Sequence, residues 1–113
     1  MILLNTTFYV DQHLIDEWHA WIVAFYFPLM AGTQVFMNPM IYRIQPQGDD
    51  EGSVSFAVQF SVMSEHDLEL WENKINAMMQ SSLKEHFGEQ ALCFSTVLES
   101  WPSRSQQNRD QQG

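Results

Sequence analysis

Apolar and polar residues alternate in several parts of this chain with the period of two that is typical of β-strands. The cleanest case is residues 53–63, where every second residue from Val54 to Val62 is Val or Phe and the residues between them are Ser, Ala or Gln. Three further segments are rich in β-branched and aromatic residues and are also predicted to be strands: residues 2–10, 35–44 and 91–101. Pro39 cannot donate a ladder hydrogen bond, so its strand is expected to lie at a sheet edge or to carry a bulge.

Two segments between these strands have apolar residues at helical spacing instead. The first covers residues 12–27, with an apolar stripe formed by Leu14, Trp18, Trp21, Ile22 and Phe25. Pro28 is expected to break or kink this helix, because proline lacks an amide hydrogen and clashes with the preceding turn. The second helix is expected to start at a capping box, Ser64 to Asp67, and to end at Gly88. Its predicted apolar stripe is Leu68, Trp71, Ile75, Met78, Met79 and Leu83.

The order of these elements, β-α-β-β-α-β, predicts a single α+β domain over residues 1–101. Right-handed crossovers would form a four-stranded antiparallel sheet with both helices on one face, the ferredoxin-like sandwich, with strand order 4-1-3-2. The remaining residues, 102–113, contain no large apolar side chain beyond Pro102 and are predicted to be a disordered polar tail.

Helices would cover only one face of that sheet, so the residues on its other face are the candidates for binding. Strand alternation places polar and apolar residues together there: Asn5, Thr7, Tyr9, Ala57, Gln59, Ser61, Ser95 and Val97. The same alternation puts Cys93 on this face and gives Thr96 the helix-facing position. Polar groups on inner strands need solvent, one another or a ligand. We therefore expect a second copy of the chain to cover this face, forming a homodimer with room for a small apolar ligand.

The charge of the chain disfavours negatively charged partners. The chain has 14 acidic residues and 5 Lys and Arg, a formal net charge of −9. Such a surface repels phosphate backbones and anionic lipid headgroups, so neither nucleic acid nor a membrane is a predicted partner. No apolar run approaches the roughly 20 residues that span a bilayer, and the first residues lack the profile of a signal peptide. With Cys93 as the sole cysteine, a cytoplasmic protein is expected.

The spacing of several residues resembles an uncharacterised bacterial domain-of-unknown-function family of the dimeric α/β-barrel superfamily. The resemblance covers about residues 1–101 and is carried by Trp18, Trp21, Pro28, the turn from Gly32 to Phe36, Gln59-Phe60, Phe87-Gly88, and the run Phe94, Thr96, Leu98, Glu99. It implies two ferredoxin-like sheets packed face to face. This chain departs from the family pattern at Tyr26, where the family has a histidine, and at Ser95, where it has an arginine. An activity that used either residue would be lost here.

No catalytic, metal or cofactor signature is present in the sequence. His13 and Glu17 lie one helical turn apart, but His19 points elsewhere, so no three-ligand metal site forms locally. Cys93 has no histidine near it in the sequence and is interpreted as a structural thiol rather than a nucleophile. The chain also lacks a phosphate-binding glycine loop and the G-x-S-x-G and H-E-x-x-H motifs. No catalytic residue is assigned, and no cofactor or metal is predicted.

Three hypotheses about function follow. The first is a non-catalytic homodimeric module that binds a small ligand or a protein through Asn5, Thr7, Tyr9 and Gln59, with Trp21 and Tyr26 as further candidates. The second, suggested by the superfamily, is a small cofactor-independent enzyme similar to monooxygenases, acting on an aromatic or apolar substrate. That enzyme would need a closed cavity and a group with a perturbed pKa. The third is an adaptor whose acidic face binds a basic protein.

Overall fold

The computed structural model describes residues 2–46 and 52–101 of the chain, and the predicted polar tail lies outside these residues. Its strands are β1 (Ile2–Asp11), β2 (Phe36–Arg43), β3 (Ser53–Val62) and β4 (Ala91–Glu99). They form one antiparallel sheet in the order β2-β3-β1-β4, with β1 and β3 paired over their whole length. The predicted ferredoxin-like α+β fold and strand order are therefore confirmed.

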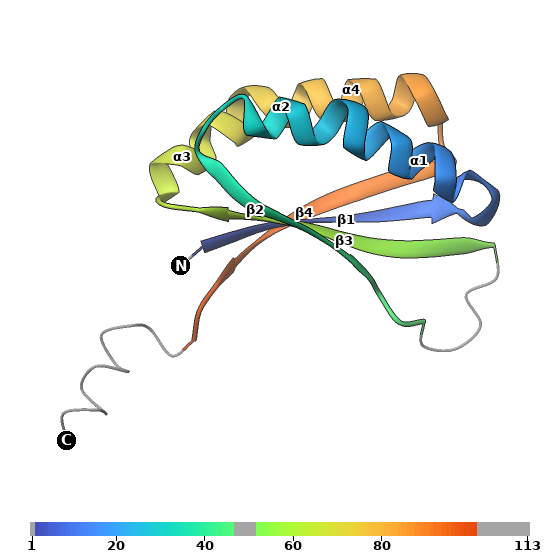
Figure 1. Cartoon of the computed structure of the whole chain (residues 1–113), viewed down its shortest axis with the longest axis horizontal. Helices are drawn as coiled ribbons and strands as arrows, with labels where there is room; N and C mark the ends of the chain where they lie inside the picture. The colour runs from blue at the N-terminus through green and yellow to red at the C-terminus, as the bar shows by residue number, and fades with distance from the viewer. Residues whose placement is uncertain (1, 47–51, 102–113) are drawn as a thin grey trace.

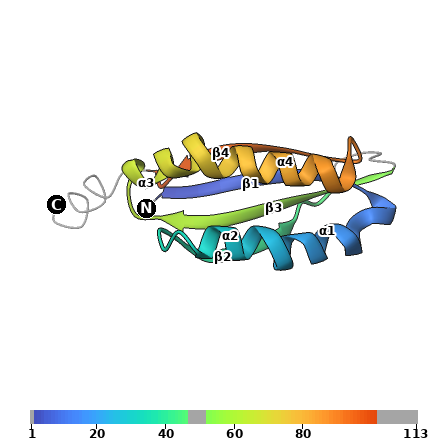
Figure 2. The same ribbon diagram turned by 90° about the horizontal axis from the view of Figure 1, so that it is seen from above.

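Two helical stretches cover one face of the sheet and leave the other uncovered (Figure 1). The first runs through η1 (Gln12–Leu14), α1 (Ile15–Trp21), η2 (Ile22–Tyr26) and α2 (Phe27–Ala31). The second runs through α3 (Glu65–Leu70), η3 (Trp71–Ile75) and α4 (Asn76–Phe87). Seen from above, the two stretches lie on either side of the central strands β1 and β3 (Figure 2). Each contains one π-helical segment in its interior, η2 and η3.

The first helix extends past its predicted end at residue 27, so Pro28 does not break it. The helix continues to Ala31, with Pro28 in the first turn of α2. The π-helical segment just before it explains how. In that segment the amide of Phe27 donates to the carbonyl of Ile22, five residues back, and such a wider turn relieves the ring–carbonyl clash that a proline causes in an α-helix. The helix then stops at Gly32, whose amide donates to the Pro28 carbonyl at 2.9 Å.

The second helix begins and ends where the sequence predicts. Ser64 accepts a hydrogen bond from the amide of Asp67 at 3.3 Å, and Gly88 follows the last helical residue with a φ of 61°. Its buried stripe is Leu68, Trp71, Ile75, Met79, Leu83 and Phe87, whereas Met78 is 45% exposed and was wrongly assigned to the stripe. From Trp71 to Phe87 the buried residues are four apart, slightly more than the 3.6 residues of an α-helical turn, so in a regular α-helix they would drift around the helix axis. The wider π-helical turn of η3 offsets this drift and keeps the buried residues on one face.

β2 is an edge strand with a bulge, as Pro39 predicted. Its register against β3 shifts between Met37 and Met40, and Asn38 within the shift has a φ of 56°. A proline at a bulge in an edge strand leaves no ladder hydrogen bond unmade.

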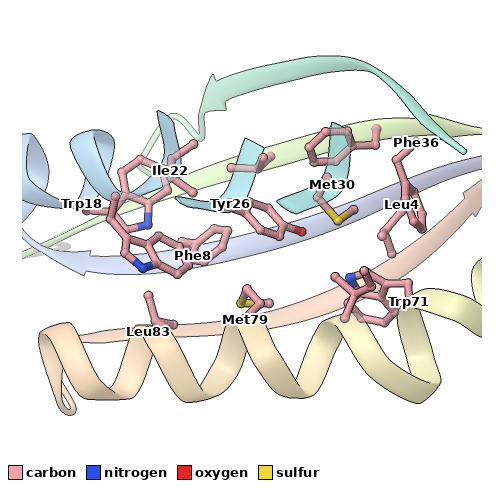
Figure 3. Packing of buried hydrophobic residues seen from close by; sticks show 14 of the residues in the cluster. Leu4, Phe8, Trp18, Ile22, Tyr26, Met30, Phe36, Trp71, Met79 and Leu83 are labelled. Atoms are coloured by element: carbon pink, nitrogen blue, oxygen red, sulfur yellow. The ribbon is translucent and has the colours of Figure 1, made fainter. Parts of the chain in front are cut away.

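Aromatic side chains fill the space between the helices and the sheet. Phe8 of β1 lies at the centre, with its ring centroid 5.3 Å from that of Trp18 and 6.1 Å from that of Tyr26 (Figure 3). The largest fully buried side chains come from both layers: Trp18, Tyr26, Phe8, Phe60, Leu4, Ile22, Met30 and Met79. Burying this much apolar surface is the main force that holds the helices on the sheet.

Candidate functional site

The β4 side chains that lie on the uncovered face of the sheet are not the ones that the sequence predicted. The two sets are exchanged. The hydroxyls of Thr6 and Ser95 are 2.8 Å apart, and the Cys93 thiol contacts the Met79 sulfur at 3.9 Å beneath α4. Cys93, Ser95 and Val97 therefore have the helix-facing parity, and Thr96 lies opposite Asn5 on the uncovered face. The prediction failed because β4 has apolar residues at both parities. Its alternation alone could not assign a face.

We call the uncovered side of the sheet the open face. It is formed by Leu3, Asn5, Thr7 and Tyr9 of β1, Met37, Met40 and Tyr42 of β2, Ser55, Ala57, Gln59 and Ser61 of β3, and Leu92, Phe94, Thr96 and Leu98 of β4.

Polar side chains form a hydrogen-bonded ladder along the middle of the open face. The side-chain amide nitrogen of Gln59 donates to the side-chain oxygen of Asn5 at 3.2 Å. The side-chain amide nitrogen of Asn5 donates in turn to the Thr7 hydroxyl at 3.2 Å. Farther along, Asn38 donates to the Ser61 hydroxyl at 3.4 Å. The structure thus brings together three of the predicted site residues, Asn5, Thr7 and Gln59.

Large apolar side chains flank this polar ladder on both edge strands. Tyr9, the fourth predicted site residue on this face, lies beside Phe94, with ring centroids 5.9 Å apart. On the two edge strands, the exposed apolar side chains of the open face are Met37, Met40 and Tyr42 of β2 and Leu92, Phe94 and Leu98 of β4. Because β4 turns this side outward, the open face is more apolar than the sequence indicated.

Charge is distributed very unevenly between the two sides of the molecule. None of the open-face residues defined above is acidic or basic. Charge returns only at the end of β1, where the Asp11 carboxylate lies 3.0 Å from His13. The helical layer carries the acidic residues Asp16, Glu17, Glu65, Asp67, Glu69, Glu72 and Glu85, against Lys74 and Lys84. Depletion of charge is a typical property of the centre of a protein interface.

Trp21 and Tyr26 lie on the opposite side of the sheet from the other four predicted site residues. The Trp21 indole donates to the Ser82 hydroxyl at 3.0 Å and joins the two helices. It forms part of a groove of about 370 Å³ that is also lined by Glu17, Ala20, Ala24, Phe25, His86 and Phe87. Tyr26 is fully buried in the core beneath. The six predicted residues therefore belong to two separate regions and not to one pocket.

A group of polar atoms lies inside the core around Tyr26. Its hydroxyl and the indole nitrogen of Trp71 are both buried. Burial raises the pKa of Tyr26 to about 12, although hydrogen bonds with the side chains of Thr6 and Trp71 oppose the rise. The helical spacing predicted a core position for Trp71, and no role was predicted for Thr6. A signal was present in β1, because Thr6 is polar at the core-facing parity between Leu4 and Phe8.

The remaining chemical candidates are not arranged for catalysis. Burial raises the pKa of the Cys93 thiol to about 11, whereas a nucleophilic cysteine needs a lowered one. Within residues 2–46 and 52–101, no three His, Cys, Asp or Glu side chains are grouped to hold a metal ion. None of the described helices is both long and apolar enough to span a membrane.

Comparison with known proteins yields a family and a weak structural similarity. No curated protein matches the chain. A solved structure, described as a dimeric ferredoxin-like protein from an uncultured marine organism, aligns with a TM-score of 0.47 and 9% identity, over 90% of this chain and 97% of that one. A family model described as a domain of unknown function, DUF4286, matches residues 1–101, and the chain belongs to that family.

Proposed function

We propose that the protein is a non-catalytic homodimeric binding module in which the open face packs against the same face of a second copy. The observation that carries this proposal is the combination of exposed apolar flanks with the lack of acidic and basic side chains between Leu3 and Tyr9 of β1 and on the strand segments beside them, in a chain whose net charge is −9. A large exposed apolar surface and the depletion of charge are both typical of interaction sites.

The size of the open face supports a stable dimer. With strands of eight to ten residues, a four-stranded face has a projected area on the order of 600 Å² at about 4.8 Å between strands and 3.4 Å per residue. The accessible surface of protruding side chains exceeds this projection. The accessible surface of the open face is therefore comparable with the roughly 800 Å² that each partner buries in a standard protein–protein interface.

The charge distribution favours a second copy over a basic partner. Two chains of net charge −9 repel each other least when their uncharged faces meet and their acidic helical layers point outward. A basic protein would be attracted to the helical layer and would gain nothing electrostatically on the open face. The adaptor hypothesis therefore does not account for the apolar flanks.

The polar ladder supports a role in binding a small neutral ligand between the two sheets. In a face-to-face packing, Asn5 and Gln59 of one copy would lie opposite the ladder of the other, with the aromatic rings of Tyr9 and Phe94 beside them. Each amide in the ladder has hydrogen-bonding capacity beyond the bonds it makes within the chain. The absence of charge favours an uncharged ligand, because an ion there would lose hydration without gaining a partner.

The enzyme hypothesis is not favoured by the arrangement of the core. It required a cavity between the sheet and the helices, and that space is filled by buried side chains such as Trp18, Phe8 and Phe60. The titratable groups there, Tyr26 and Cys93, both have raised pKa values and are neutral at pH 7.

The test of the dimer is a lysine placed at Gln59, in the middle of the open face. Gln59→Lys is expected to bury two unpaired charges in the dimer while reaching solvent in the monomer, so the dissociation constant is expected to rise at least about a hundredfold. Sedimentation equilibrium of the wild type and the variant measures this change.

A matched control is Val23→Lys, since Val23 is 50% exposed on the helical layer. This variant is expected to dimerise like the wild type. A Gln59→Lys variant that stays dimeric with unchanged affinity would show that the open face is not the interface. Native mass spectrometry of the same samples would reveal a retained small molecule, which is expected to be lost together with the dimer.

A further inference from the structure

The groove that Trp21 lines on the helical layer has the size of a small-molecule site. It lies where the first helical stretch faces the C-terminal part of α4, and Figure 2 shows α1 and this part of α4 at the same end of the sheet. Its volume of about 370 Å³ falls within the range of ligand pockets. Ala20 and Ala24, four residues apart on the first stretch, leave this space open because their side chains are short.

Aromatic rings line this groove in two orientations. The rings of Trp21 and Phe25 are nearly parallel, with centroids 5.5 Å apart and an interplanar angle of 25°. The Phe87 ring is almost perpendicular to that of Trp21, at 85° and a centroid distance of 6.2 Å. The hydrogen bond of 3.0 Å from the Trp21 indole to the Ser82 hydroxyl holds the indole in place. Because the face of an aromatic ring carries partial negative charge, rings arranged in this way attract a cation.

The polar side chains at the groove accept hydrogen bonds rather than donate them. The Glu17 carboxylate is an acceptor. Nδ1 of His86 lies 2.9 Å from the Ser82 carbonyl oxygen, which can only accept, so this nitrogen carries a proton. In the neutral imidazole the other nitrogen, Nε2, is then an acceptor. The Trp21 indole already donates its proton to the Ser82 hydroxyl. A ligand in the groove must therefore supply the donors.

The charges around the groove also favour a cation. Glu17 lines it, whereas Lys74 and Lys84 each line a different pocket, one beside α3 and one toward β4. The residues next in sequence, Asp16 and Glu85, are acidic as well. The net charge of −9 adds a long-range attraction for cations. A ligand with a carboxylate or phosphate group would be repelled.

We propose that this groove binds a small organic ammonium ion, a primary amine that carries an aromatic or branched alkyl group. The ammonium group donates hydrogen bonds to the Glu17 carboxylate and to Nε2 of His86, and its charge lies against the aromatic rings. The apolar part of the ligand fills the space over Ala20 and Ala24. The site lies on the helical side of the sheet, so it is separate from the neutral-ligand site proposed on the open face and does not depend on the dimer.

The first experiment is an NMR titration of the full chain with 2-phenylethylamine, 2-phenylethanol and phenylacetate, which have similar shapes but are a cation, a neutral alcohol and an anion. The amine is expected to bind with a Kd of about 1 mM or lower, at least about tenfold more tightly than the alcohol, and phenylacetate is expected not to bind. The Trp21 indole N–H resonance is expected to shift. The Trp71 indole lies in the core beside Tyr26 and is the internal reference. Equal affinities for amine and alcohol, or an unshifted Trp21 resonance, would overturn the proposal.

The variant Glu17→Gln separates a specific contact from the general attraction of an acidic chain. Glu17 is exposed, so the fold is expected to be kept while the Kd for 2-phenylethylamine rises about fivefold. Glu72→Gln is the matched control, because Glu72 is exposed on η3 outside the groove and its loss changes the net charge equally. This control is expected to bind the amine like the wild type. Equal Kd values for the two variants would contradict the site.

The variant Phe25→Leu tests the aromatic contribution separately. Leucine keeps an apolar side chain at this half-buried position but removes one ring from the groove. The affinity for 2-phenylethylamine is expected to fall more than the affinity for 2-phenylethanol, because a ring attracts the charged ligand more strongly than the neutral one. An equal loss for both ligands would show that the rings act only as an apolar surface.

Discussion

At the scale of single residues, two weak acids are held neutral by their burial. The pKa of Tyr26 is raised to about 12 and that of Cys93 to about 11. Both lie on the helical side of the sheet, where Tyr26 is fully buried and Cys93 contacts Met79. Transfer of a charged side chain into such surroundings is strongly unfavourable. Neither residue is therefore available as a base or nucleophile at neutral pH.

The raised pKa of Tyr26 predicts a loss of stability at high pH. Tyrosine in the unfolded chain titrates near pH 10, so below that pH its stabilising contribution is fully present. Between about pH 10 and 12 the unfolded chain loses the proton while the folded protein keeps it, and stability falls. From pH 9 to 11.5, the free energy of unfolding is expected to fall about 2 kcal/mol more in the wild type than in Tyr26→Phe. Urea denaturation measures both, and parallel pH curves would contradict the assignment.

At the scale of elements, the ends of the second helical stretch follow local sequence signals, whereas the interiors of both stretches do not. Ser64 and Gly88 bound the second helical stretch as their capping chemistry requires. The π-helical segments inside both stretches have no such signal. They arise where packing against the sheet must be reconciled with Pro28 in one helix and with an apolar spacing of four residues in the other.

The cap at Ser64 provides a stability prediction for one element. Ser64→Ala removes the hydrogen bond from the Asp67 amide, so the free energy of unfolding is expected to fall by about 1 kcal/mol. Ser81→Ala is the control, because Ser81 is exposed inside α4 and alanine has the higher helix propensity. Its stability is expected to be unchanged or slightly higher in chemical denaturation. Equal effects of the two substitutions would show that the cap contributes nothing.

At the scale of the whole molecule, the sheet separates an uncharged side from an acidic one. The open face has apolar flanks around an amide and hydroxyl ladder, and the helical layer carries most of the described acidic residues. Association through the open face would leave the two acidic layers outermost. The proposed dimer therefore depends on apolar contact and is opposed by the net charge.

This arrangement predicts that salt strengthens the dimer. Raising the salt concentration from about 20 to 300 mM shortens the Debye length severalfold and screens the repulsion between two chains of net charge −9. The dissociation constant from sedimentation equilibrium is expected to fall about threefold or more. An interface held by ion pairs would respond in the opposite direction, and such a result would contradict an uncharged interface.

The sequence by itself determined the order of the elements, the strand order and most of the core. These follow from local periodicity, which is unambiguous where one parity is apolar and the other polar, as from Val54 to Val62 in β3. It also placed Asn5, Thr7 and Gln59 on one face, because residues two apart on a strand share a face and the central strands pair in a predictable register.

Only the tertiary structure decided which side of β4 faces out and how the two helices meet over β1. In β4, Leu92 and Phe94 compete with Ala91 and Cys93 for the core, and the register against β1 selects the latter pair. The placement of Tyr26 beside Trp71 likewise depends on two π-helical turns in helices that are far apart in sequence. Such outcomes are set by packing between elements, which no local pattern encodes.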